Sequence, residues 1–119
     1  MRRIVRGRVA AAAILLPLFL SGETVAACDH PPKPPAMPQG ATATDDEMKE
    51  GRVNLQTYVN ILQAYQACLD KLVKDAPPDT KPEDKQKWQA MSDNAIDAAH
   101  EIADVYSIQL RAFKARQQQ

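Results

Sequence analysis

The side chains best suited to chemistry in this sequence are those of its two cysteines, Cys28 and Cys68. In an exported chain, an even number of cysteines favours a structural disulfide. An extended arm from Cys28 to Ala43 reaches about 50 Å, whereas a helix that begins at Thr44 rises only about 36 Å before it reaches Cys68. The arm is therefore long enough to bring the two sulfurs together. A disulfide that closes a loop of about 40 residues stabilises a fold by roughly 4 kcal/mol.

Two other chemistries compete for Cys28. Residues 25–28 (Val-Ala-Ala-Cys) resemble a bacterial lipoprotein cleavage box, in which an acylated Cys28 anchors the protein to a membrane and cannot form the disulfide. The spacer before it contains Glu23 and is long for that class. Alternatively, cleavage before an unmodified Cys28 gives a mature chain that begins Cys28-Asp29-His30. Its free amine, two backbone amides and the His30 imidazole would then supply a square of nitrogens suited to Cu(II) or Ni(II).

His100 is a further candidate for metal binding or proton transfer. Asp97 and Asp104 lie three and four residues from it and share its helical face. This face lies opposite the apolar residues of the same segment, so a solvated surface explains it more simply. The sequence contains no HExxH, CxxC, GxSxG, P-loop or dinucleotide-binding pattern. It therefore predicts a protein that is not an enzyme.

Residues 1–27 have the composition of a secretory signal peptide. Four arginines within the first eight residues precede an apolar run over residues 9–20, and small residues follow at 25–27. This run is shorter than the ~20 apolar residues of a membrane-spanning helix. We therefore expect an exported protein of the periplasm or the extracellular space, with a membrane attachment only if Cys28 is lipidated.

Removal of this leader changes the charge balance. It takes away four of the 15 basic residues and one of the 15 acidic residues, which leaves a net charge of about −3. The remaining basic residues are scattered among acidic ones. Surfaces that bind DNA or RNA need clustered basic residues, so nucleic acid is not an expected partner.

Residues 28–43 are predicted to form an extended arm, because five prolines between positions 31 and 38 exclude a helix. A helix is expected over residues 45–74. Thr44 and Glu47 match a capping box at its start, and Pro77 ends it. Leucines and tyrosines recur along one face at steps of three and four residues: Leu55, Tyr58, Leu62, Tyr65, Leu69 and Leu72.

A second helix is expected over residues 81–115. Thr80 and Glu83 repeat the capping-box pattern, and Pro82 suits the first helical turn. We expect the helix to fray beyond Phe113, where apolar periodicity stops. Its apolar face comprises Trp88, Met91, Ala95, Ala98, Ile102 and Val105, and then shifts through Tyr106 and Leu110 to Phe113.

These elements predict an all-α fold, in which residues 44–119 form an antiparallel two-helix hairpin and the proline-rich N-terminal arm is extended. The two helices present a coiled-coil-like interaction face of Leu55, Tyr58, Leu62, Tyr65, Leu69, Trp88 and Ile102. Other apolar side chains, including Ile61, Tyr106 and Phe113, lie off this narrow seam. Either the arm shields them, or two hairpins associate as a homodimeric four-helix bundle.

The order of these features resembles a group of small exported proteobacterial helical proteins of uncharacterised function. The resemblance covers the chain after the leader and depends on Cys28, the spaced prolines, Gly40, the acidic helix start with Met48, Tyr65-x-x-Cys68 and residues 109–114 (Gln-Leu-Arg-Ala-Phe-Lys). It implies an envelope or secreted helical protein with a disulfide between Cys28 and Cys68, and it implies no activity.

The sequence as a whole favours a non-enzymatic exported protein that binds an envelope protein or itself through an apolar helix face. The alternative is a copper- or nickel-binding protein that uses Cys28, Asp29 and His30. A small-molecule carrier with its ligand between the helices is a third hypothesis. No cofactor is expected unless copper or nickel occupies the His30 site.

Overall fold

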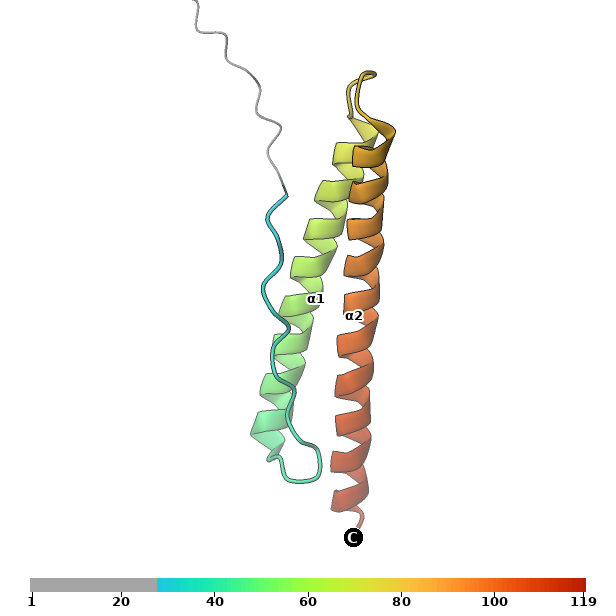
Figure 1. Ribbon diagram of the computed structural model, residues 1–119. Helices are drawn as coiled ribbons and strands as arrows, with labels where there is room; N and C mark the ends of the chain where they lie inside the picture. Colours follow the sequence, from blue (N-terminus) through green and yellow to red (C-terminus); the bar gives the residue numbers. More distant parts are fainter. Residues whose placement is uncertain (1–27) are drawn as a thin grey trace, which may run out of the picture.

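The computed structural model describes residues 28–119, and the predicted leader (residues 1–27) lies outside the described residues. The fold of the described part consists of two helices, α1 (Asp45–Lys74) and α2 (Pro82–Gln117). The helices run antiparallel and are joined by a short turn, and the chain before α1 lies along the hairpin (Figure 1). The prediction of an all-α hairpin with an extended N-terminal arm is confirmed.

The start of α1 is the one predicted from its sequence. The Glu47 main-chain N–H donates a hydrogen bond to the Thr44 hydroxyl (3.2 Å), and the Thr44 N–H donates one to the Glu47 carboxylate (2.7 Å). These reciprocal bonds form the predicted capping box. At the other end, Lys71 and Lys74 occupy the last turn, where positive charge interacts favourably with the helix dipole.

The start of α2 differs from the prediction, because the expected capping box at Thr80 is absent. Lys81 is the N-cap residue and makes no side-chain cap hydrogen bond. Thr80 belongs to the connecting turn, where its N–H donates to the Pro77 carbonyl oxygen over 3.0 Å. A proline disfavours the helical conformation in the residue before it, and Lys81 is accordingly extended (φ −62°, ψ 136°). Pro82 therefore fixes the first position of α2.

The end of α2 lies further along the chain than predicted. The helix continues to Gln117, so the fraying expected beyond Phe113 is wrong. Arg116 donates a hydrogen bond to the Ala43 carbonyl oxygen, and Gln117 donates one to Asp45 Oδ1 over 3.1 Å. These polar contacts tie the last turn to the start of α1. Apolar periodicity carries no information about them.

The core lies where the two helices and the arm meet. One group of buried apolar residues consists of Tyr58, Leu62, Tyr65, Leu69, Ala95 and Ile102. A second group, at the end away from the connecting turn, consists of Ala43, Met48, Tyr106 and Phe113. Met37 and Leu55 pack against both groups, so the arm takes part in a continuous core.

Apolar residues expected outside the predicted seam are buried beside the end of the arm, whereas one residue expected on the core face is exposed. Tyr106 and Phe113, expected to lie off the seam, are each 8% exposed, because the end of the arm covers them and adds Ala43 to the same cluster. Val105, expected on the core face, is 40% exposed. Shielding by the arm therefore accounts for Tyr106 and Phe113, while Val105 stays at the surface with Ile61, which is 38% exposed.

Candidate interaction surface

A disulfide joins Cys28 to Cys68, with the two Cα atoms 5.8 Å apart. It ties the first described residue of the arm to α1, and the arm then runs along the hairpin toward the start of that helix (Figure 1). The bond uses the Cys28 sulfur that a lipid anchor would require. No helix within residues 28–119 combines the length and apolar character needed to cross a membrane.

Gly40 fixes the other end of the arm. Its N–H donates a hydrogen bond to Gln109 Oε1 on α2 over 2.9 Å. A Cβ atom at this position would lie 1.8 Å from the Gln109 carbonyl oxygen, and a helix backbone cannot move aside as a side chain can. Only glycine therefore permits this approach. The sequence pattern alone does not indicate this role of Gly40.

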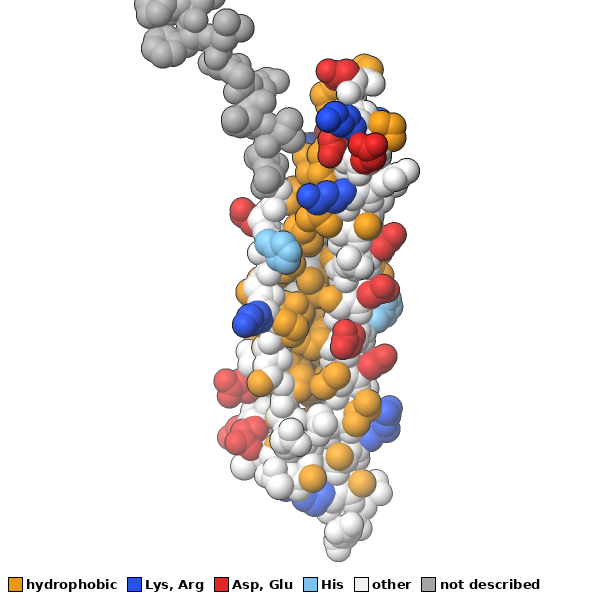
Figure 2. All heavy atoms as spheres, viewed as in Figure 1, with side chains coloured by type: hydrophobic (Ala, Val, Ile, Leu, Met, Phe, Trp, Pro, Cys, Tyr) orange, Lys and Arg blue, Asp and Glu red, His pale blue; other side chains and the backbone are white. Residues whose placement is uncertain are grey.

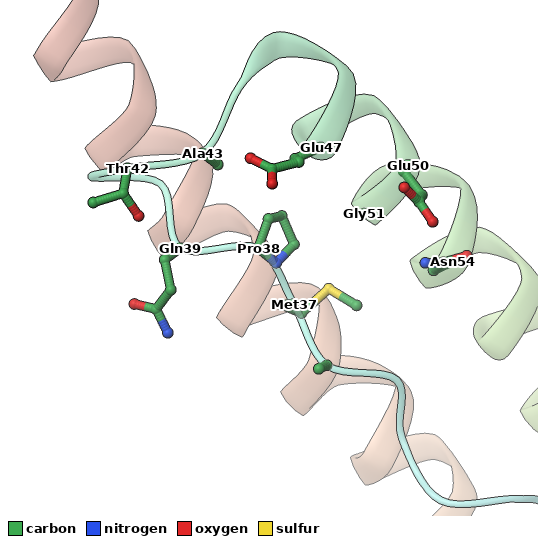
Figure 3. Close-up of a pocket in the computed structure, with 10 residues that line it drawn as sticks. Met37, Pro38, Gln39, Thr42, Ala43, Glu47, Glu50, Gly51 and Asn54 are labelled. Atoms are coloured by element: carbon green, nitrogen blue, oxygen red, sulfur yellow. The ribbon is translucent and has the colours of Figure 1, made fainter.

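Gly51 allows a similar approach on α1. It is buried, and a Cβ atom at this position would lie 2.6 Å from a ring carbon of Pro38. Figure 3 shows Pro38 and Met37 of the arm facing this part of the helix, beside a hollow of about 350 Å³ that Glu47 and Glu50 also line. Glycine is a weak helix former, but Gly51 provides the space that the arm needs at this point.

An apolar groove runs between the arm and α2, and we call it the arm groove. Its volume is about 510 Å³. Residues 30–34 form its arm side, while its other walls include Tyr58, Leu62 and Tyr65 from α1 and Met91, Ala95 and Ala98 from α2. Figure 2 shows its hydrophobic side chains as a long seam between more polar margins. The arm thus does not close completely over the core.

The arm groove continues along α2 as a smaller hollow of about 180 Å³. Pro34 and Ala98 line both spaces, and Val105 lines the second. One turn further along the helix, Ile108 is 53% exposed. Open apolar surface therefore extends from the arm groove to the side of α2 that carries Val105 and Ile108, which we call the outer side of α2.

The predicted interaction face lies mostly inside the hairpin. Leu62 and Leu69 are 2% and 1% exposed, and Tyr58, Tyr65 and Ile102 are also buried. Leu55 and Trp88 are only partly buried; Trp88 lines a separate hollow of about 400 Å³ near the connecting turn. Most of these side chains thus hold the hairpin together. The apolar surface open to a partner lies beside them, on the arm and on the outer side of α2.

The two histidines occupy exposed positions. The His30 ring packs against Tyr65 with 5.7 Å between ring centres, and its Nδ1 lies 3.2 Å from the Pro31 carbonyl oxygen. In the predicted nitrogen square, this imidazole would instead bind a metal together with the amine of Cys28. His100 lies on α2, and within the described part of the chain no three His, Cys, Asp or Glu side chains converge as metal ligands.

The described residues therefore define a two-helix hairpin closed by a disulfide-tied arm, with an apolar groove left open. No protein-family profile matches this chain, and neither a curated protein nor a solved structure shows a significant match. Function has to be inferred from the arm groove and from the surface next to it.

Proposed function

We propose that this chain is a non-enzymatic exported protein that acts by binding another protein, either an envelope partner or a second copy of itself. The observation that carries the proposal is the arm groove with its continuation to Val105 and Ile108. It leaves large apolar side chains in contact with water along one side of the hairpin. Exposed apolar patches of this kind commonly mark protein interaction sites.

The groove is also preformed. Its arm wall contains Pro31, Pro32 and Pro34, and prolines have little conformational freedom to lose. On the opposite wall, Tyr58 and Tyr65 are held by the core. Binding to a preformed surface avoids much of the entropy cost of ordering it. These features suit the binding of an apolar segment better than the catalysis of a covalent reaction.

Export is supported by the leader pattern of residues 1–27 and by the disulfide, which is compatible with an oxidising compartment. The resemblance to small exported proteobacterial helical proteins points the same way. The intact mass of the protein from its host tests this. We expect a chain that begins at Cys28 and is two hydrogens lighter than its reduced form. An added lipid mass would instead indicate a membrane anchor on Cys28.

Photo-cross-linking in cells tests the binding itself. A photoreactive amino acid at Val105 should trap a protein, while the same group at Gln63, an exposed α1 residue that lines none of the hollows described above, should not. Sedimentation of the purified protein then shows whether the trapped partner is a second copy. A monomer that also yields no cross-linked species at Val105 would count against the proposal.

Copper or nickel binding is the second candidate, favoured by the exposure of His30 two residues after Cys28. Correctly processed protein should then bind one equivalent of Cu(II) in a calorimetric titration. His30→Ala should abolish this site, whereas His100→Ala, a change at the other exposed histidine, should not. Equal Cu(II) binding by the His30→Ala protein would rule out a metal site that uses His30.

A further inference from the structure

We propose that the outer side of α2 binds a second copy of this chain through an antiparallel, two-fold symmetric contact centred between Val105 and Ile108. The inference rests on the proposed function, because it names the partner of the same surface. Three features support it. They are a second regular stripe on α2, the compatible layers that this stripe would form if paired with itself, and the charges that flank it.

The stripe lies next to the core face of α2. Its residues alternate by steps of three and four: Ala98, Glu101, Val105, Ile108, Ala112 and Ala115. This is the spacing of a coiled-coil seam. The buried apolar residues of α2, among them Ile102 and Tyr106, lie on the neighbouring face, so α1 does not use this stripe as its main contact. Small alanines near both ends allow another helix to approach closely.

An antiparallel pairing of this stripe with itself gives compatible layers. When Val105 packs against Ile108 of the second copy, Ala98 meets Ala115 and Glu101 meets Ala112. The two exposed large hydrophobic side chains of α2, Ile108 (53%) and Val105 (40%), then cover each other. A parallel pairing would place Glu101 against Glu101, and facing like charges disfavour that alignment.

The flanking charges favour the same alignment. Asp104 and Arg111 are exposed and seven residues apart, on the flank of the stripe away from its core side. In an antiparallel pair, equivalent flanks of the two helices face each other, so Asp104 lies beside Arg111 of the second copy. The two-fold symmetry forms this ion pair twice. In a parallel pair, Asp104 would instead face the neutral Gln109.

The arm extends the same contact. The hollow of about 180 Å³ between Pro34, Pro35 and Val105 opens on this side of α2. In the antiparallel register, Ile108 of the second copy is the side chain that lies at the level of Val105. It would fill this hollow and remove the prolines from water, which adds apolar burial to the helix contact.

Sedimentation of the oxidised mature protein tests the interface, and we expect a dimer. Ile108→Asp should raise the dimer dissociation constant by about tenfold or more, because it places a charge in the central layer. Val53→Asp is the matched control, since Val53 is 62% exposed on α1 and lies outside the stripe; it should leave the dimer unchanged. Circular dichroism checks that both variants remain helical.

Charge reversal provides a second test that does not depend on the central layer. Asp104→Arg and Arg111→Asp should each weaken the dimer by roughly fivefold. Combining both changes in one chain should restore the original affinity, which a parallel dimer would not do. A dimer insensitive to Ile108→Asp, or a charge swap without recovery, overturns this interface.

A protein that stays monomeric at all concentrations also overturns the inference. The proposed function survives that result if a photoreactive group at Val105 still traps an envelope protein in cells. It fails as well if no species is trapped, so the two failures are distinguishable.

Discussion

The hydroxyl of Tyr106 on α2 donates a buried hydrogen bond to the main-chain carbonyl oxygen of Met48 on α1, 3.0 Å away. Both residues belong to the cluster at the end of the hairpin away from the connecting turn. No loop joins α1 to α2 at this end within the described residues, so non-covalent contacts between the helices and with the arm hold it closed. The bond therefore stabilises the part of the hairpin that depends most on tertiary contacts.

Tyr106→Phe should lower the free energy of unfolding by about 1 kcal/mol, because the ring stays in place while the hydrogen bond is lost. Urea unfolding of the oxidised protein measures this change. Tyr65→Phe is the control, since Tyr65 is buried to a similar degree (7% exposed) and packs through its ring against His30. A loss as large in the control would show that the bond to Met48 is not the cause.

The disulfide should contribute more than any single hydrogen bond. Reduction should lower the free energy of unfolding by about 4 kcal/mol, because the unfolded chain regains the freedom that a closed loop of about 40 residues removes. Urea unfolding with and without a reductant tests this expectation. A protein with Cys28→Ser and Cys68→Ser should match the reduced protein and should not respond to the reductant. A response in that protein would point to an effect unrelated to the disulfide.

The main features of the fold could be predicted because they are local. Regular spacing from Leu55 to Leu72 indicated the apolar face of α1, and Thr44 with Glu47 indicated its start. The same local pattern was misleading at Thr80, where the restriction that Pro82 imposes on the preceding residue outweighs the capping preference. A local pattern thus predicts that a helix forms. It does not show which of two competing local preferences fixes the residue at which the helix begins.

The surface open to a partner was harder to predict. Periodicity shows which side chains share a helix face, but not which element covers that face. Leu69 and Ile102 therefore entered the predicted interaction face although they are buried in the core. The close approaches at Gly40 and Gly51 involve the arm, α1 and α2, and the spacing of residues along one segment carries no sign of them.

Gly40→Ala tests the close approach of the arm to α2. We expect a loss of about 1–3 kcal/mol in the free energy of unfolding, because the new Cβ would overlap the Gln109 carbonyl oxygen. Thr42→Ala, a change at an exposed position in the same turn, should have little effect. Unchanged stability in the Gly40→Ala protein would show that the arm can move away from α2 without cost.

Gly51→Ala should cost less than Gly40→Ala. The added methyl group would displace the Pro38 ring, 2.6 Å away, but alanine favours a helix over glycine by about 1 kcal/mol and offsets part of that cost. Thermal unfolding of the two variants side by side measures the difference. A larger loss at Gly51 would mean that the contact with Pro38 is less able to adjust than the backbone contact of Gly40.

A polar contact joins α1 and α2 through Ser92. Ser92 is 4% exposed, and its hydroxyl donates a hydrogen bond to Asp70 Oδ1 over 2.9 Å. Ser92→Ala should lower the free energy of unfolding by about 1 kcal/mol, whereas Ser107→Ala, at an exposed position of the same helix, should change it little. A double-mutant cycle with Asp70→Ala isolates the pair. If the loss in the double variant equals the sum of the losses in the two single variants, the Ser92 hydroxyl and the Asp70 carboxylate contribute independently of their hydrogen bond.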